Sequence, residues 1–265
     1  MTGETHPPRE KEPPKSWQHY NLWLRVKEAL LNLPKHFESA ITVSGINVTE
    51  IYTFSGVLSS TIEEETVRTL NNLRNLWDPN GTYEDYVFVR QPSSFPDVLL
   101  KHQFTGEIIM GIELKSWYLL SKEGEPSFRY TVTPNACADQ DLLVVVPWVL
   151  SNVISGRPIV FKPFIISARY AAEYRNYWWQ HVRETNEDRT IISPSNVSPY
   201  PPGRDFIDDK PKEDKGKNFG RLARTGIMDE WVRSFDEIKI LGIKVKDWRD
   251  FFKNATRVTR QSTLI

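Results

Sequence analysis

The stretch 95–117, FPDVLLKHQFTGEIIMGIELKSW, decides the fold of this 265-residue chain. It begins with a short apolar run at 98–100, continues through the turn-forming pair Thr105-Gly106, and ends in a longer apolar run, Glu107–Lys115. Two apolar runs joined by a glycine-containing turn are typical of a β-hairpin. The sequence therefore predicts two antiparallel strands, with Asp97 at the start of the first and Lys115 at the end of the second.

Side chains alternate between the two faces of a strand, so the return strand divides into two sets. The apolar set comprises Ile108, Met110, Ile112 and Leu114, and the other set comprises Ile109, Gly111, Glu113 and Lys115. We expect the apolar set to face the core. Glu113 and Lys115 then point the same way, and Gly111 leaves room beside them for a metal ion or a DNA backbone.

Asp97, Glu113 and Lys115 are the residue types that Mg²⁺-dependent phosphodiester hydrolysis requires. Mg²⁺ takes oxygen ligands and keeps several waters, so Asp97 and Glu113 would be its protein ligands. Such a cation acidifies a bound water, which Lys115 would hold or deprotonate. Separately, Pro-Asp is a common turn dipeptide, and Glu-x-Lys is a common solvated pair at a strand edge. Their combination in one hairpin is what indicates a catalytic site.

Pro96-Asp97, followed after fifteen residues by Glu113-Leu114-Lys115, resembles the PD-(D/E)xK signature of the restriction-endonuclease-like nuclease superfamily. The resemblance implies an enzyme like the type II restriction endonucleases, which uses Mg²⁺ and cuts double-stranded DNA at a short sequence. It also implies a homodimer on a palindrome, because two-fold protein symmetry matches two-fold DNA symmetry. The alternatives are a structure-selective or repair nuclease of the same fold, and a non-catalytic DNA-binding or assembly protein. The intact Asp, Glu and Lys favour an enzyme.

Members of this superfamily usually carry an acidic residue on a helix before the motif. Here Ser59-Ser60-Thr61 precedes three glutamates, Glu63 to Glu65, which predicts a capped helix with an acidic first turn that runs to about Trp77. Its apolar face would comprise Val67, Leu70, Leu73 and Trp77, with Glu63 at the edge of that face. We therefore expect Glu63, rather than Glu64 or Glu65, to reach the site. The alternative is that all three glutamates only favour the positive N-terminus of the helix.

The order of predicted elements favours an α/β fold. We expect a restriction-endonuclease-like core at about 55–177, with a central mixed β-sheet flanked by helices and an extra helical elaboration towards the C-terminus. Further strands are predicted at 142–146 and 164–166; helices at 16–33, 219–239 and 246–253; and a long ordered loop or insertion at 192–217. Residues 16–265 would form a single nuclease domain after a disordered, proline-rich tail, 1–15.

The charge balance limits the kind of DNA binding that we expect. The chain has 34 Lys and Arg and 34 Asp and Glu residues, so it lacks the overall positive field of a general nucleic-acid binder. This balance weakens the non-specific, salt-sensitive part of binding and favours specific sites.

The single cysteine, Cys137, excludes an intramolecular disulfide and indicates a reducing compartment. With no leader and no membrane-spanning run, a cytoplasmic protein without a membrane or disulfide-linked partner is expected. The resemblance to the restriction endonucleases implies a prokaryotic cell.

A second cluster, RYAAEYRNYWWQH at 169–181, interleaves arginines with aromatic residues. Such a pattern can contact phosphates and bases, so Arg169 and Arg175 are candidate DNA contacts. At helical spacing the aromatic residues also form a stripe that is typical of a core or a dimer interface. Lys217 and Arg221 lie in a later mixed-charge run and would either clamp a DNA backbone or remain solvated. No two histidines have a metal-ligand spacing, so a zinc site is not expected.

Overall fold

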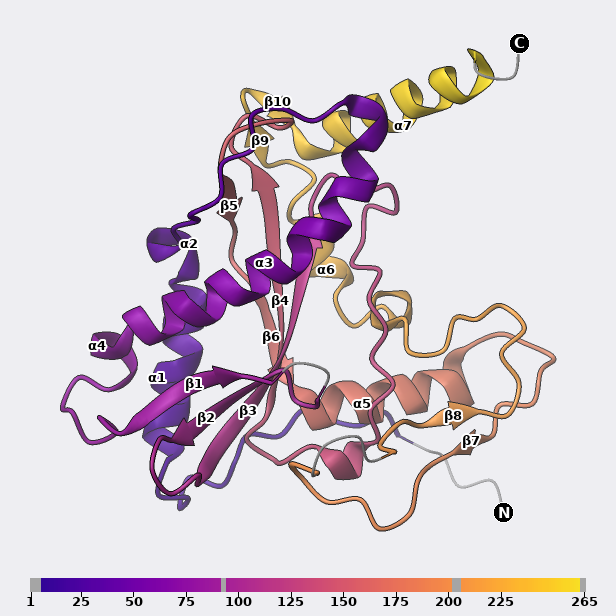
Figure 1. The fold of residues 1–265 in the computed structure, drawn as a ribbon. Coiled ribbons are helices and arrows are strands. Elements are labelled where there is room, and N and C mark those ends of the chain that lie inside the picture. Colours follow the sequence, from indigo (N-terminus) through magenta and orange to yellow (C-terminus); the bar gives the residue numbers. More distant parts are fainter. Residues whose placement is uncertain (1–5, 92–93, 202–205, 263–265) are drawn as a thin grey trace.

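The computed structural model describes residues 6–91, 94–201 and 206–262, the last six of these by their backbone alone. It has an α/β fold in which a curled, mixed β-sheet is flanked by helices (Figure 1). In the view of Figure 1, helix α3 (Ile51–Asn72) crosses in front of the upper part of the sheet, and α1 (Tyr20–Leu31) stands behind the strands at its left edge. The predicted fold class is confirmed at this level.

The sheet contains β1 (Tyr86–Arg90), β2 (Val98–His102), β3 (Ile108–Tyr118), β4 (Leu142–Leu150), β5 (Pro158–Val160) and β6 (Phe164–Ser167). Its order is β1-β2-β3-β4-β5, and β6 also pairs with β4. The first three strands form an antiparallel meander, β4 runs parallel to β3, and both β5 and β6 run antiparallel to β4. The predicted hairpin and both later strands are confirmed. β1 was not predicted, although its sequence YVFVR has the β-branched and aromatic residues of a strand.

Both faces of the central strands are covered. Strand β4 is buried at every residue, as its continuous apolar sequence LLVVVPWVL suggests. On β3, Ile109 is as deeply buried as Met110 on the opposite face. The expectation that Gly111 leaves room for a ligand is wrong, because a Cβ atom at this position would collide with the ring of Pro96 and lie 3.0 Å from Asp141 Oδ1.

Helix α1 buries one face, and its buried side chains follow helical spacing: Leu22, Trp23, Val26, Ala29 and Leu30. The helix predicted at 16–33 is therefore confirmed in its central part. It ends at Leu31, and Pro34 lies in the first turn of the short helix α2 (Leu33–His36), where its missing N–H costs nothing.

Helix α3 begins earlier than predicted. It follows the 3₁₀ turn η1 (Val48–Glu50), which Asn47 caps by accepting from the N–H of Thr49, so Glu63 to Glu65 lie in the middle of the helix. Ser59 does not cap the helix, because its hydroxyl donates to the carbonyl of Ser55 within it. The alternative role for the glutamates at a helix N-terminus is therefore wrong. The predicted apolar face is buried, and a further short helix, α4 (Arg74–Trp77), completes it.

The C-terminal part is less helical than predicted. Its elements are α5 (Ala168–Tyr177), the π-helical turn η3 (Trp178–Val182), β7 (Ile191–Ile192), β8 (Lys210–Pro211), the 3₁₀ turn η4 (Leu222–Thr225), α6 (Asp229–Arg233), β9 (Lys239–Ile240), β10 (Ile243–Lys244) and α7 (Val245–Ser262). The helix predicted at 219–239 is mostly wrong, because Gly220 and Gly226 adopt left-handed conformations that interrupt it. The last predicted helix is confirmed and extends further, as α7. Before β4, the loop after β3 contains the 3₁₀ turn η2 (Pro134–Ala136).

The described part of the expected N-terminal tail, residues 6–15, is held against the rest of the molecule. Glu10 Oε1 accepts a hydrogen bond of 2.7 Å from the N–H of Ser167, and Glu12 Oε2 accepts one of 2.8 Å from the hydroxyl of Tyr20. Pro13 is buried. Residues 1–5 lie outside the described residues. In the described ranges, no helix is both long enough and apolar enough to span a bilayer.

Candidate active site

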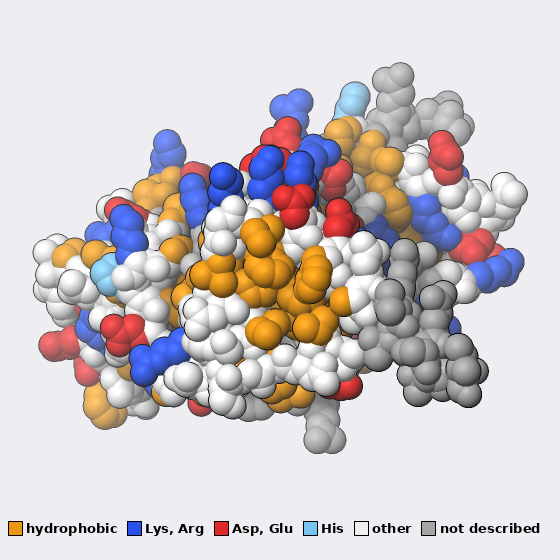
Figure 2. All heavy atoms as spheres, turned by 90° about the horizontal axis from the view of Figure 1, so that it is seen from above, with side chains coloured by type: hydrophobic (Ala, Val, Ile, Leu, Met, Phe, Trp, Pro, Cys, Tyr) orange, Lys and Arg blue, Asp and Glu red, His pale blue; other side chains and the backbone are white. Residues whose placement is uncertain are grey.

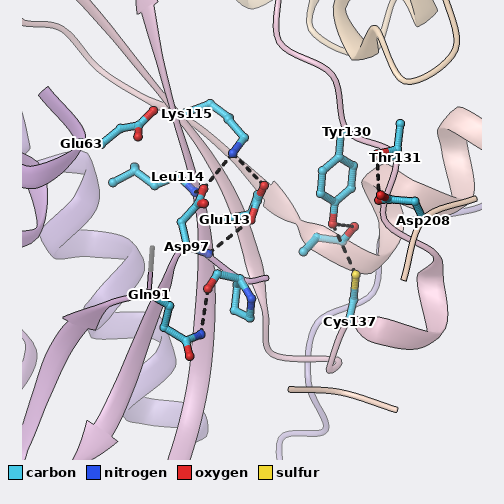
Figure 3. Close-up of polar contacts among 12 residues, drawn as sticks. Glu63, Gln91, Asp97, Glu113, Leu114, Lys115, Tyr130, Thr131, Cys137 and Asp208 are labelled. Carbon is cyan, nitrogen blue, oxygen red and sulfur yellow. Dashed lines mark hydrogen bonds and ion pairs between the residues drawn. The ribbon is translucent and has the colours of Figure 1, made fainter. Parts of the chain in front are cut away.

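The hairpin brings Asp97, Glu113 and Lys115 into contact. Val98 pairs with Ile112, so Asp97, which precedes β2, lies beside Glu113 of β3. Lys115 follows Glu113 by two residues and therefore points to the same face. Its Nζ atom lies 2.8 Å from Asp97 Oδ2 and 2.7 Å from Glu113 Oε1 (Figure 3). The structure thus unites the three residues that the sequence singled out.

Backbone groups hold the two carboxylates in place. Asp97 Oδ2 accepts from the N–H of Leu114 at 3.0 Å, and Glu113 Oε2 accepts from the N–H of Asp97 at 3.3 Å. Gln91 fixes the loop before β2, because its N–H donates to Asp97 O at 2.7 Å and its Nε2 donates to Pro96 O at 3.0 Å. The peptide bond between Phe95 and Pro96 is cis. Each carboxylate is therefore fixed by the neighbouring strand or its flanking residue.

Burial and mutual charge set the protonation of the site. Burial raises the pKa of Glu113 to about 7; Lys115 opposes this shift, and Asp97 adds to it. Burial lowers the pKa of Lys115, but the carboxylates of Glu113 and Asp97 outweigh burial and raise it above its ordinary value. Lys115 is therefore an ammonium group. Because a base must be neutral, this arrangement favours Lys115 as a donor to a water or a phosphate.

Glu63 comes to the same side of the molecule from α3. Figure 3 shows its side chain pointing towards Asp97 and Lys115. Glu63 Oε2 lies 3.3 Å from Arg90 Nη2, and its pKa is raised, chiefly by burial. Glu64 is exposed, whereas Glu65 is buried against Arg68 and the N–H of Ala40. Of the three glutamates, the structure brings Glu63 to the site.

Asp97 and Glu113 fit a cation that is bound partly through other ligands. In the described part of the chain, no group of three or more His, Cys, Asp or Glu side chains is arranged to hold a metal ion. Mg²⁺ commonly takes one or two carboxylates and completes its shell with waters and substrate phosphate oxygens. Burial raises the pKa of Glu113, so a cation at this point would favour its ionised form. The donor set is therefore compatible with Mg²⁺.

A cleft of about 350 Å³ opens beside these residues. Glu63 and Lys115 line it, together with the first half of α3, the end of β3 and residues from the segment 121–128. Lys122 and Glu123 are further charged residues in its wall. The cleft thus gives a ligand access to the side of Lys115.

Asp141 supports the site, and sequence reasoning missed it. Its buried carboxylate accepts hydrogen bonds from Gly111 N at 2.7 Å, Ala138 N at 2.8 Å and Tyr200 Oη at 2.7 Å. Burial raises its pKa to about 6. Together with the ring of Pro96, it fills the space beside Gly111 and so supports the loop that carries Asp97. The one feature of the sequence that could have indicated its role is that Asp141 directly precedes the apolar run 142–150.

Arg175 is not available as a DNA contact, because it is 1% exposed and its Nη2 lies 2.6 Å from Asp209 Oδ2. Its Nη1 donates to the carbonyls of Tyr130 and Val132. Arg169 is half-buried, and its Nε lies 3.0 Å from Asp139 Oδ1. Neither arginine stands free at the surface as the sequence suggested.

Lys217 and Arg221 lie together with Arg129, a residue that was not predicted as a DNA contact. Arg129 forms an isolated antiparallel bridge with Arg221, and its Nη2 donates to the carbonyl of Lys217 at 2.6 Å. Arg224 follows nearby, with its Nε 4.0 Å from Glu125 Oε1. We call Arg129, Lys217, Arg221 and Arg224 the basic group. Arg129 directly follows Phe128, which is part of the cleft wall.

Comparison with family models, with curated proteins and with solved structures found no match. Asp97, Glu113 and Lys115 form the centre of the site, Glu63 lies at its edge, and the cleft lies beside it.

Proposed function

We propose that this protein is a divalent-cation-dependent nuclease that hydrolyses phosphodiester bonds of double-stranded DNA. One observation carries the proposal: a carboxylate directly before β2, a carboxylate on β3 and one ammonium group meet within 2.8 Å beside a cleft. These groups provide cation ligands and a positive donor at one point. The residue types and their order along the hairpin also match the nuclease signature that the sequence resembles.

Each residue has a defined role in this proposal. Asp97 and Glu113 would hold Mg²⁺, which when bound lowers the pKa of a water and neutralises charge that develops on the phosphate. Lys115, as an ammonium, would donate to the attacking oxygen or to a non-bridging phosphate oxygen and stabilise the negative charge there. Glu63 would hold the cation through a water or contact a second cation directly. Asp141 would act through Gly111 and Pro96 by keeping Asp97 in position.

The basic group would position the DNA backbone. Arg129 and Lys217 are exposed, and Arg129 directly follows Phe128 of the cleft wall. Lysine and arginine contacts to phosphates fix the register of a protein on DNA without reading its sequence. Such local contacts allow DNA binding by a chain whose total charge is zero.

The test is incubation of the full chain with several plasmid DNAs in Mg²⁺, with EDTA as the control. Discrete fragments would support a site-specific enzyme, and a smear would indicate a non-specific nuclease. DNA that is bound but remains uncut would favour the non-catalytic alternative. Asp97→Asn and Glu113→Gln should abolish cutting, whereas Asp139→Asn, which changes a carboxylate outside the site, should not. Full activity in EDTA would contradict the role of the cation.

The finer proposal is a type II restriction endonuclease-like homodimer that acts on a palindromic sequence. It predicts discrete fragments whose ends map to a two-fold symmetric sequence. It also predicts that sedimentation of the protein–DNA complex shows two protein chains bound to each DNA site. A structure-selective nuclease of the same chemistry would instead leave intact plasmid uncut and cut DNA with unpaired nucleotides. The cleft favours testing this second substrate class.

A further inference from the structure

Buried hydroxyl groups without a hydrogen-bond partner gather on the cleft beside Lys115. Within the described ranges, Tyr52 Oη, Ser116 Oγ and Tyr118 Oη have no hydrogen-bond partner within the protein, and all three residues line this cleft. Tyr118 is only 6% exposed. Buried polar atoms in proteins are nearly always hydrogen-bonded, so a cluster of unpaired hydroxyls in one cleft indicates that a polar ligand belongs there.

The cleft has the size and the surface for one nucleotide. Its volume of about 350 Å³ lies at the lower end of the range for small-molecule sites, which is about 300–1,000 Å³. Hydroxyl groups both donate and accept, so they can pair with the polar edge of any base. Tyr52 and Phe128 are half-buried in the cleft wall and offer aromatic surface for stacking.

One wall is open for a flat ligand. Helix α3 presents Ser55, Gly56 and Ser59 to the cleft, and a Cβ atom added at Gly56 would meet nothing within 4 Å. The cleft also lies beside the proposed catalytic residues. Lys115 and Glu63 line it, and Arg129 of the basic group directly follows Phe128 in the chain. A nucleotide in the cleft would therefore place an adjoining phosphate near Lys115.

We propose that this cleft receives one unpaired nucleotide of the DNA substrate, next to the phosphodiester that is cut. The inference rests on the proposed nuclease function and names its substrate class: DNA in which a nucleotide is unpaired or leaves the stack at the cut site. Extruding a base from a duplex costs free energy, and that cost is smallest where the base is already unpaired. Little preference among bases is expected, because hydroxyls accept several pairing patterns.

The experiment compares a short duplex that contains one unpaired 2-aminopurine with the same duplex fully paired. Binding to the full chain is measured by anisotropy and by 2-aminopurine fluorescence in Ca²⁺, which should support binding without turnover. We expect the duplex with the unpaired nucleotide to bind roughly tenfold more tightly, because it avoids the cost of extrusion. The environment of 2-aminopurine should also change on binding.

Gly56→Leu fills the cleft from a helix position where the structure leaves space. Leucine has a higher helix propensity than glycine, so the fold should be retained, while the preference for the unpaired nucleotide should be lost. Ser60→Leu adds the same side chain at an exposed position of α3 outside the cleft lining and should keep the preference. Tyr52→Phe and Tyr118→Phe remove only a hydroxyl and should weaken binding of the unpaired probe about three- to tenfold. Their thermal stability should not fall, because no protein hydrogen bond is lost.

Cleavage of both duplexes in Mg²⁺ separates this inference from the nuclease proposal. If the wild type cuts both duplexes equally and Gly56→Leu changes nothing, the inference is overturned while the nuclease function stands. If the wild type prefers the unpaired probe but cuts neither duplex, the assignment of the cleft is supported and the nuclease function is overturned. If neither duplex is bound, both proposals fail.

Discussion

Lys115 Nζ lies 2.8 Å from Oδ2 of Asp97, the residue directly before β2, and 2.7 Å from Oε1 of Glu113, so the ammonium group bridges the two carboxylates. Lys115→Met keeps the length of the side chain but removes the charge that the two carboxylates share. We expect single-turnover cleavage to fall by about 10²-fold or more, as for loss of a charge-stabilising donor. DNA affinity, measured by anisotropy in Ca²⁺, should change by only a few-fold, because Lys115 acts on the reacting atoms.

The control for this substitution is Lys239→Met, which removes an exposed lysine on β9. It should leave cleavage unchanged. Cleavage by Lys115→Met at the wild-type rate would remove Lys115 from the proposed mechanism, whatever the result for the carboxylates.

The three glutamates of α3 should respond differently to substitution by glutamine. Glu63 faces the site, so Glu63→Gln should lower the cleavage rate without lowering the melting temperature. Glu64 is exposed, and Glu64→Gln should affect neither quantity. Glu65 is buried and paired with Arg68, so Glu65→Gln should lower the melting temperature. The cleavage rate per folded molecule should equal that of the wild type. Rates and thermal unfolding curves of the three variants check this pattern.

If Glu63→Gln cleaves DNA at the wild-type rate, α3 has only a structural role. A loss of rate in Glu64→Gln would contradict the orientation of the helix. The pattern thus tests both the role of Glu63 and the structure of α3.

The hairpin and the contact between Asp97, Glu113 and Lys115 could be predicted because they depend on local sequence. Period-two alternation places Glu113 and Lys115 on one face, and the short turn makes the two strands antiparallel neighbours. A register shift between Leu100 and Lys101, which the sequence did not show, places Asp97 directly beside Glu113. Both rules act within the stretch 95–117. The buried strand 142–150 was equally visible, because a strand covered on both faces is continuously apolar.

Features that depend on distant segments could not be predicted. Gly111 looked open because the sequence does not show that Pro96 and Asp141 fill the space beside it. Arg175 looked like a surface cation because its partner, Asp209, lies more than thirty residues further along the chain. The start of α3 was missed because a serine hydroxyl can cap a helix or donate back to a carbonyl inside it, and Ser59 does the latter.

Cation binding should depend on pH through Glu113. Burial raises the pKa of this carboxyl from 4.5 to about 7, so the folded protein holds the proton more tightly than the unfolded chain. Without a cation, the contribution of Glu113 to stability is therefore present below pH 4.5 and is lost as the pH rises towards 7. A divalent cation binds the ionised carboxylate and competes with this proton.

Mg²⁺ should consequently raise the melting temperature more at pH 8 than at pH 6, because a ligand that binds the folded state stabilises it. Thermal unfolding with Mg²⁺ and with EDTA at both pH values measures the effect. Glu113→Gln should remove the Mg²⁺-dependent difference. An equal gain at both pH values in the wild type would separate cation binding from Glu113.

Arg175 should contribute to stability, in contrast to its expected role in DNA binding. Its guanidinium is buried against Asp209, with further donation to the carbonyls of Tyr130 and Val132, so Arg175→Ala leaves a buried carboxylate with less compensation. Breaking such a pair costs about 3–5 kcal/mol, although Asn176 Nδ2 also donates to Asp209 at 2.7 Å and will offset part of this. The half-buried pair of Arg169 with the exposed Asp139 should contribute only about 0–1 kcal/mol.

Urea unfolding of Arg175→Ala and Arg169→Ala, beside DNA binding at several salt concentrations, separates the two roles. Arg175→Ala should unfold at a much lower urea concentration, whereas the salt dependence of DNA binding by its folded fraction should match that of the wild type. Arg129→Ala and Lys217→Ala should show the opposite behaviour, with normal stability, weaker binding and a smaller salt slope, because each would remove a proposed phosphate contact. The contrary outcome is that Arg175→Ala keeps its stability and loses DNA affinity. The guanidinium of Arg175 would then have to leave Asp209 and contact the DNA, so the buried ion pair would be absent from the DNA-bound protein.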